Sequence, residues 1–250
     1  MSKTEKSQLL KLLKENQALK KKLNLKEDIP SYSFSQITLL ELHSIVKIKP
    51  RLNYAKFNDW FNHSNITLNN TDKSFLENLI NKHAFSIETY KEETLKVKFI
   101  SPILNRIDFS DLEKEICDFY DEPLTYETEK FILTGKVDFM VSKGYFYSEK
   151  PYFFIQEFKP STTANNPQPQ LLAELIAAIE LNQFTTIKGV FIIGTIWHFV
   201  ILEKIGNENY QYFISKSYDS TDFEKIQGIY KNLLYVKQEI FALQDNNEII

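Results

Sequence analysis

The chain has 250 residues, of which 43% are hydrophobic and 25% charged, and its formal net charge is −3. These values exclude wholesale disorder and a chain that binds polyanions by bulk charge alone. With no apolar run of the roughly 18 residues that span a membrane, no visible signal peptide and a lone cysteine, Cys117, we expect a cytoplasmic protein without a membrane partner.

Residues 1–26 carry a short heptad pattern. Leucines and one asparagine recur at alternating spacings of three and four residues, at Leu9, Leu12, Asn16, Leu19 and Leu23. This pattern is typical of a parallel two-stranded coiled coil with asparagine at an a-type position. We expect a basic helix that either forms a homodimer through residues 9–23 or packs on its own domain. Sedimentation with and without residues 1–26 would decide, since an unchanged oligomeric state excludes the dimer.

Residues 27–87 read as short helices joined by polar turns. Pro30 and Pro50 interrupt the segment, and the run Asn69-Asn70-Thr71-Asp72 predicts a helix start. The segment contains no chemical motif, so we predict a helical segment without an assigned role.

Residues 88–250 change from helical to alternating hydrophobic periodicity and back. The pattern predicts a helix over 89–104, strands over 124–130, 133–141 and 152–159, a helix over 167–182, a hairpin of strands over 189–193 and 197–203, a strand over 210–215, and a closing helix over 221–244. This order predicts an α/β domain with a central mixed sheet flanked by helices, preceded by the N-terminal helical extension.

The strand predicted over 152–159 ends in an acid and a base. Strand side chains alternate, so Glu157 and Lys159 point to the same side, and Pro160 ends the strand directly afterwards. Burying either charge alone is costly, so the two are either a structural ion pair or functional.

The preceding strand carries one carboxylate, Asp138, between Val137 and Phe139. If the two strands pair antiparallel, Asp138 approaches Glu157. Two carboxylates beside a single lysine form a hard-oxygen site suited to Mg²⁺, with Mn²⁺ as a substitute. Glu92 in the preceding helix and Gln170 in the following one complete an ordered set of polar residues.

This order resembles the PD-(D/E)xK phosphodiesterase superfamily, which has the restriction endonuclease-like fold. The closest pattern is that of the nuclease domain of type I restriction R subunits. Glu92 precedes Ile100-Ser-Pro-Ile-Leu104, Gly135-Lys-Val-Asp138 is similar to the glycine-x-x-Asp strand, Glu157-Phe-Lys159 fits (D/E)-x-K, and Gln170-Leu171 is similar to the pair that opens the next helix. Val137 stands at the place of the name-giving proline, and Glu174 at the place of the tyrosine in the glutamine-x-x-x-tyrosine variant.

The resemblance implies a metal-dependent nuclease. Asp138 and Glu157, with the carbonyl of Phe158, would hold Mg²⁺, and Glu92 would bind the metal directly or through water. Lys159 would position or activate the attacking water, and Gln170 would orient the phosphate or Lys159. The implied reaction is hydrolysis of a phosphodiester bond by a metal-activated water, with DNA favoured over RNA as the substrate.

Two other functions remain open. The first is a catalytically inactive module of the same fold that binds nucleic acid or protein, which is favoured by the net negative charge and by the presence of only two arginines, Arg51 and Arg106. The second, a carboxylate-pair glycosidase, is disfavoured by the adjacent lysine. His198 lies in an alternating strand pattern, so we expect a structural residue rather than a metal ligand.

Overall fold

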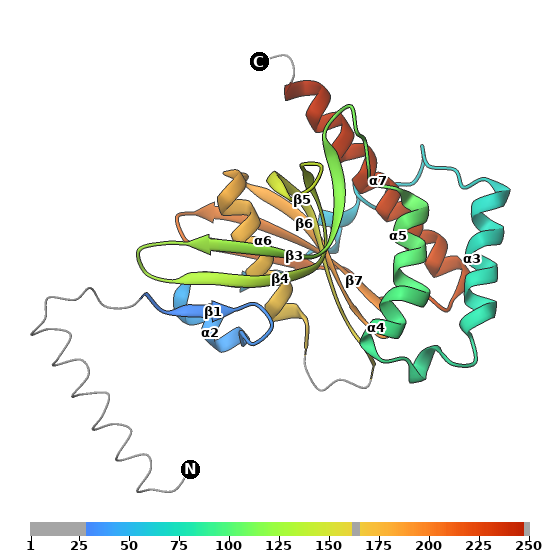
Figure 1. Cartoon of the computed structure of the whole chain (residues 1–250), viewed down its shortest axis with the longest axis horizontal. Coiled ribbons are helices and arrows are strands. Elements are labelled where there is room, and N and C mark those ends of the chain that lie inside the picture. The colour runs from blue at the N-terminus through green and yellow to red at the C-terminus, as the bar shows by residue number, and fades with distance from the viewer. Residues whose placement is uncertain (1–28, 162–165, 248–250) are drawn as a thin grey trace, which may run out of the picture.

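A computed structural model describes residues 29–161 and 166–247 of the chain (Figure 1). The predicted basic helix over residues 1–26, with its dimer seam at residues 9–23, lies outside the described residues. In chain order, the elements are β1 Ser31–Ser33, α2 Leu39–Ile45, β2 Lys47–Pro50, η1 Tyr54–Phe57, α3 Asn70–His83, η2 Ile87–Thr89, α4 Glu92–Leu95, η3 Lys96–Ile100, α5 Ser101–Ile107, β3 Ile116–Glu127, β4 Ile132–Lys143, β5 Glu149–Lys159, α6 Gln168–Asn182, β6 Thr186–Ile193, β7 Ile196–Gly206, β8 Asn209–Ile214, β9 Tyr218–Asp219 and α7 Phe223–Asn247.

Nine strands of the described residues form one curled, mixed sheet. Its main order is β1-β4-β5-β6-β7-β8-β2, with β3 added to β4 and β9 to β7. The pairs β1–β4, β2–β8 and β5–β6 are parallel, whereas the other neighbours are antiparallel. Parallel neighbours need a crossover connection, and α6 provides it between β5 and β6.

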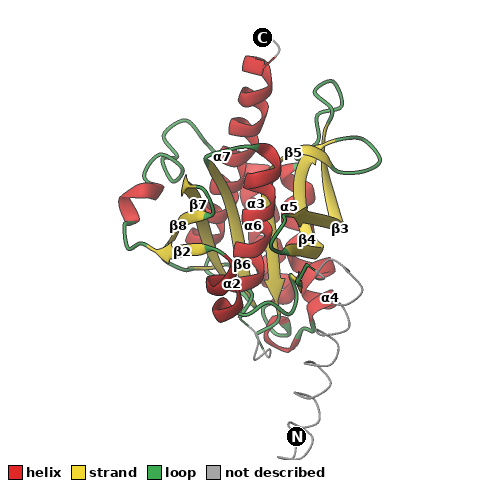
Figure 2. Ribbon diagram, turned by 90° about the vertical axis from the view of Figure 1, so that its left-hand side faces the viewer, coloured by secondary structure: helices red, strands yellow, loops and turns green. Residues whose placement is uncertain are grey.

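Helices cover both faces of the sheet, and each face has its own hydrophobic core (Figures 1 and 2). Helices α2 and α6 pack on one face, and α3, α5 and α7 on the other. Helix α6 lies between the sheet and α2, so every residue from Gln170 to Ile179 is buried. The run from Leu171 to Ile179 is accordingly apolar apart from Glu174, rather than amphipathic, and the Glu174 side chain is fully buried.

The predicted α/β class, with a central mixed sheet flanked by helices, is confirmed. The strands and helices predicted between residues 88 and 250 all form, with bounds shifted by a few residues. The largest shift is in β3, which begins at Ile116 rather than at Leu124. The part of β3 before Leu124 contains Asp118, Asp121 and Glu122, and these charged residues hide the strand pattern in the sequence.

The prediction of short helices joined by polar turns over 27–87 is wrong for two short stretches, which form strands. Strand β1 pairs in parallel with β4, and β2 pairs in parallel with β8. The predicted helix start at residues 69–72 is confirmed, because the Asn69 side chain accepts a hydrogen bond from the Asp72 amide at 2.7 Å. Among the described residues, no helix combines the length and hydropathy needed to cross a bilayer.

Candidate active site

Strand β4 changes its partner partway along its length. It pairs with β1 over residues 132–134 and with β5 from Phe139 to Lys143. Strand β5 in turn leaves β4 after Gln156 and continues beside β6 as far as Lys159. The two strands therefore diverge at the positions of Asp138 and Glu157.

Asp138 takes the place of a backbone partner at this divergence. The Phe158 amide donates a hydrogen bond to Asp138 Oδ2 at 3.1 Å. A buried N–H group needs an acceptor, and β4 no longer offers a carbonyl here, so the side chain supplies one. This bond fixes the carboxylate of Asp138 beside the last residues of β5.

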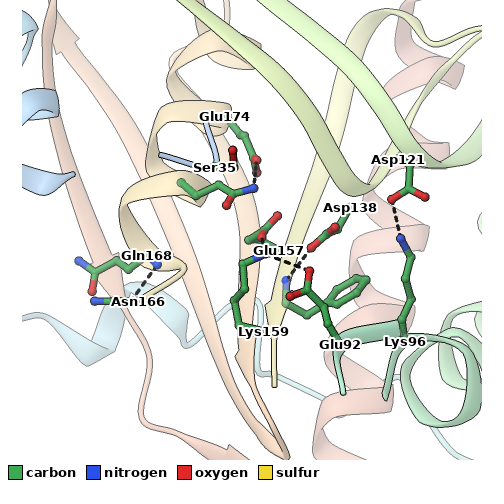
Figure 3. A network of polar contacts seen from close by, with 12 residues as sticks. Ser35, Glu92, Lys96, Asp121, Asp138, Glu157, Lys159, Asn166, Gln168 and Glu174 are labelled. Atoms are coloured by element: carbon green, nitrogen blue, oxygen red, sulfur yellow. Dashed lines mark hydrogen bonds and ion pairs between the residues drawn. The ribbon is translucent and has the colours of Figure 1, made fainter. Parts of the chain in front are cut away.

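Glu157 and Lys159 point to the same side of β5, as the alternation predicts. Lys159 Nζ lies 2.7 Å from Glu157 Oε1 and 3.2 Å from Glu92 Oε1 of α4. The side chain of Glu157 is fully buried, whereas that of Lys159 is 18% exposed. The ammonium group thus links the strand carboxylate to the helix carboxylate at the edge of solvent (Figure 3).

The carboxyl group of Glu157 is in an unfavourable place for a charge. Burial raises the pKa of Glu157 to about 9, and Asp138 adds to the rise, whereas Lys159 opposes it. Among the described residues, Oε2 of Glu157 has no hydrogen-bond donor. A carboxyl group in this position needs a proton, shared with the Asp138 carboxylate beside it, or a cation.

Lys159 responds in the opposite way to the same surroundings. Burial lowers the pKa of Lys159, but the nearby carboxylates of Glu157, Asp138 and Glu92 outweigh this effect, and the net direction is upward. The lysine is therefore charged at neutral pH, and it serves as a fixed positive group rather than as a base.

Gln170 faces a carboxyl group that sequence reasoning did not select. Its Nε2 donates to Glu174 Oε1 at 3.1 Å, one turn further along α6. Gln170 was expected to orient a phosphate or Lys159, and the hydrogen bond that the structure gives it is to Glu174 instead. Glu174 is fully buried, and its Oε2 has no donor among the described residues.

Glu174 is a third carboxyl group near Asp138 and Glu157, and it lies in the hydrophobic core. Burial raises the pKa of Glu174 well above its ordinary value, and the charges of Glu157 and Asp138 add to this effect. The signal in the sequence was a single carboxylate inside the apolar run from Leu171 to Ile179. A second residue that sequence reasoning missed is Lys96, a buried lysine one turn after Glu92 in the chain; nothing in its sequence context marks it.

The donor set suits a divalent cation held by two carboxylates. Within the described ranges, no group of three or more His, Cys, Asp or Glu side chains is arranged to hold a metal ion. Asp138 and Glu157 lie together, but Glu92 faces the Lys159 ammonium. Oε2 of Glu157 and Oε2 of Glu174 are buried and have no hydrogen-bond donor among the described residues, and a hard cation that replaces the bound protons would satisfy such oxygens.

His198 lies in β7, where its ring stacks on Phe191 at a centroid distance of 4.7 Å. Burial lowers the pKa of His198, and the ring is a packed strand side chain, as the alternation predicts.

No protein-family model matches this sequence, and a search of curated proteins finds no match. The functional conclusion therefore depends on the geometry of this site.

Proposed function

We propose that the chain is a cytoplasmic, Mg²⁺-dependent nuclease that hydrolyses phosphodiester bonds of DNA, with a restriction endonuclease-like domain of the PD-(D/E)xK type. The proposal is supported by the position of Glu92, Asp138, Glu157 and Lys159 around one strand end. It is also supported by a mixed sheet in which a crossover helix follows directly after the (D/E)-x-K strand.

One observation carries the proposal. Asp138 accepts a hydrogen bond from the Phe158 amide beside the buried carboxyl group of Glu157, which Lys159 faces at 2.7 Å, and burial raises the pKa of both Glu157 and Glu174. A structural ion pair would need one acid and one base. Excess buried acid destabilises the fold, and groups with pKa values perturbed in this way cluster at functional sites.

Each side chain has a role in this proposal. Asp138 and Glu157 would hold Mg²⁺ together with the carbonyl of Phe158. When bound, the ion lowers the pKa of a water molecule and stabilises the phosphate charge. Lys159 positions the attacking water and offsets the charge of the scissile phosphate, while Glu92 restrains the Lys159 ammonium. Gln170 donates a hydrogen bond to Glu174 and so orients this buried side chain near Glu157.

The second candidate function is the catalytically inactive module. The observation that favours it is the contact of Lys159 with both Glu157 and Glu92, which partly neutralises the acids without a metal. Calorimetric titration with Mg²⁺ or Mn²⁺ separates the two functions. Binding that is lost in Asp138→Asn supports the nuclease, and no binding at millimolar metal favours the inactive module.

The nuclease activity is tested on supercoiled plasmid, linear duplex, single-stranded DNA and RNA, with Mg²⁺, Mn²⁺ or EDTA. We expect metal-dependent cleavage of DNA that is abolished in Asp138→Ala and in Lys159→Ala, and thermal unfolding of each variant checks that the chain is folded at the assay temperature. Lys136→Ala is the matched control, because Lys136 is exposed on the same strand as Asp138. Cleavage that survives in both site variants would remove the proposed site.

A further inference from the structure

A second lysine lies beside the candidate active site. Lys96 follows Glu92 by one helical turn, so both side chains lie on the same side of the α4–η3 segment. The side chain of Lys96 is only 7% exposed, and its Nζ lies 2.6 Å from Asp121 Oδ1 of β3. In the view of Figure 3, Lys96 and Lys159 stand on opposite sides of Asp138.

Lys96 also touches the strand end that carries the acids. Its ammonium lies 5.2 Å from the ring centroid of Phe158 and 5.9 Å from that of Tyr120. Phe158 is the residue between Glu157 and Lys159, and its amide is held by Asp138. The ring of Phe158 points to the opposite side of β5 from Glu157 and Lys159, so the Lys96 ammonium lies beside the same strand end as the acids, next to a neighbouring residue.

Both partners of the Lys96–Asp121 ion pair have irregular backbones. Lys96 begins the π-helical segment η3, a feature that is rare and often occurs at functional sites. Asp121 has a φ of 53°, in the left-handed region that a non-glycine residue seldom adopts. Such conformations persist where the surrounding structure holds them, and they cluster at binding and catalytic sites.

The two members of the pair differ in their contact with water. Asp121 has a side chain that is 59% exposed, whereas Lys96 is almost completely buried. An exposed carboxylate is well hydrated, so its pairing contributes little. The buried ammonium gains more from an anion that approaches from the site and brings several oxygens. Asp121 is therefore a partner that a phosphate group can replace.

We infer that Lys96 binds a phosphate of the nucleic-acid backbone next to the scissile one, and that Asp121 holds its ammonium until the substrate displaces the carboxylate. This inference rests on the proposed function, because it places the substrate across the end of β5. Binding by Lys96 would add a phosphate contact from the α4–η3 segment, on the other side of Asp138 from Lys159. A chain with only two arginines would then bind the nucleic-acid backbone through lysines at this site.

The test measures binding of fluorescently labelled single-stranded and duplex DNA to the full-length chain by anisotropy, with Ca²⁺ in place of Mg²⁺, over a range of salt concentrations. The variants are Lys96→Met, Asp121→Asn and the double variant. Lys98→Met is the matched control, since Lys98 is an exposed lysine of the same segment.

We expect Lys96→Met to weaken binding roughly tenfold and to reduce the salt slope by about one, as for the loss of one phosphate contact. Lys98→Met should change binding by less than about twofold. Asp121→Asn should tighten binding in the wild-type background but not in Lys96→Met, because the carboxylate competes only for that ammonium.

The inference is overturned if wild-type chain binds DNA and Lys96→Met binds equally well, or if Asp121→Asn tightens binding to the same extent without Lys96. If Lys96→Met does not fold, Asp121→Asn alone decides: tighter binding than wild type supports the inference, and unchanged or weaker binding overturns it. A wild-type chain that binds no DNA would instead overturn the proposed function, and this inference with it.

Discussion

Two pairs of antiparallel strands in the same sheet end in different ways. β6 and β7 pair along a continuous ladder, from Thr186 opposite Glu203 to Ile193 opposite Ile196. β4 and β5 pair only over residues 139–143 of β4, and then separate. The continuous ladder satisfies its own amides, so its interior is apolar. The divergent pair leaves the Phe158 amide without a backbone acceptor, and the Asp138 carboxylate accepts its hydrogen bond instead.

The comparison teaches that the candidate site depends on interrupted pairing. Where strands separate, a polar side chain is needed to satisfy the backbone, and further polar groups can then be accommodated beside it. The cost is buried acid at Glu157 and Glu174. Variants at the divergence should therefore change activity and the pH dependence of stability, whereas variants in the continuous ladder should change stability alone.

The largest expected effect is on cleavage. Glu157→Gln keeps the shape of the side chain but removes the charge that would hold the metal, so we expect the rate of DNA cleavage to fall on the order of 10³-fold or more. Ile187→Val, which lies in the continuous ladder opposite Leu202, should leave the rate per folded molecule within about twofold. Steady-state assays on both variants provide the measurement, and equal losses would contradict the comparison.

The next effect is on the pH dependence of stability without metal. The ordinary pKa of a glutamate side chain is 4.5, and burial raises the pKa of Glu157 in the folded chain to about 9. Between these values the folded state keeps a proton that the unfolded state has released, so the free energy of unfolding falls as the pH rises. We expect a loss on the order of a few kcal/mol between pH 5 and pH 9, to which Glu174 contributes in the same direction.

Urea unfolding in EDTA at pH 5.5, 7 and 8.5 measures this dependence. Glu157→Gln should flatten the pH profile and make the metal-free chain more stable at pH 8.5 than the wild type. A profile in the variant as steep as that of the wild type would show that Glu157 is not the titrating group.

The smallest effect is expected in the continuous ladder. Ile187→Val removes one buried methylene group, so the free energy of unfolding should fall by about 0.5–1.5 kcal/mol. Because no titrating group is changed, this fall should be the same at pH 5.5 and at pH 8.5. If the loss grows with pH, the two strand pairs are coupled and the contrast between them is weaker than the structure indicates.

Much of the local architecture could be predicted from the sequence. Alternation along β5 places Glu157 and Lys159 on one side, and the structure has them 2.7 Å apart. The turn-forming residues before Asn70 and before Gln168 mark the starts of α3 and α6. These features depend on neighbouring residues and on the period of each element, which a single sequence contains.

Other parts of the site needed the three-dimensional arrangement. The contact of Gln170 with Glu174 was not predicted, because it depends on how deeply α6 is buried between the sheet and α2. Lys96 has ordinary neighbours in the sequence, and its importance comes from Asp121 and Phe158, which lie far along the chain.

The sequence by itself determined which residues carry charge at the end of β5, on which side of the strand they point, and that the chain has an α/β order. The tertiary structure alone decided that β1 and β5 share the same edge of β4, that the amide of Phe158 therefore turns to Asp138, and that Glu174 lies buried behind Glu157. The physical reason is the range of the interactions. Hydrophobic period and turn chemistry act over a few residues, whereas strand partners and burial are set by packing between segments that lie far apart in the chain, as Ser31 and Ile132 do, and Lys47 and Asn209.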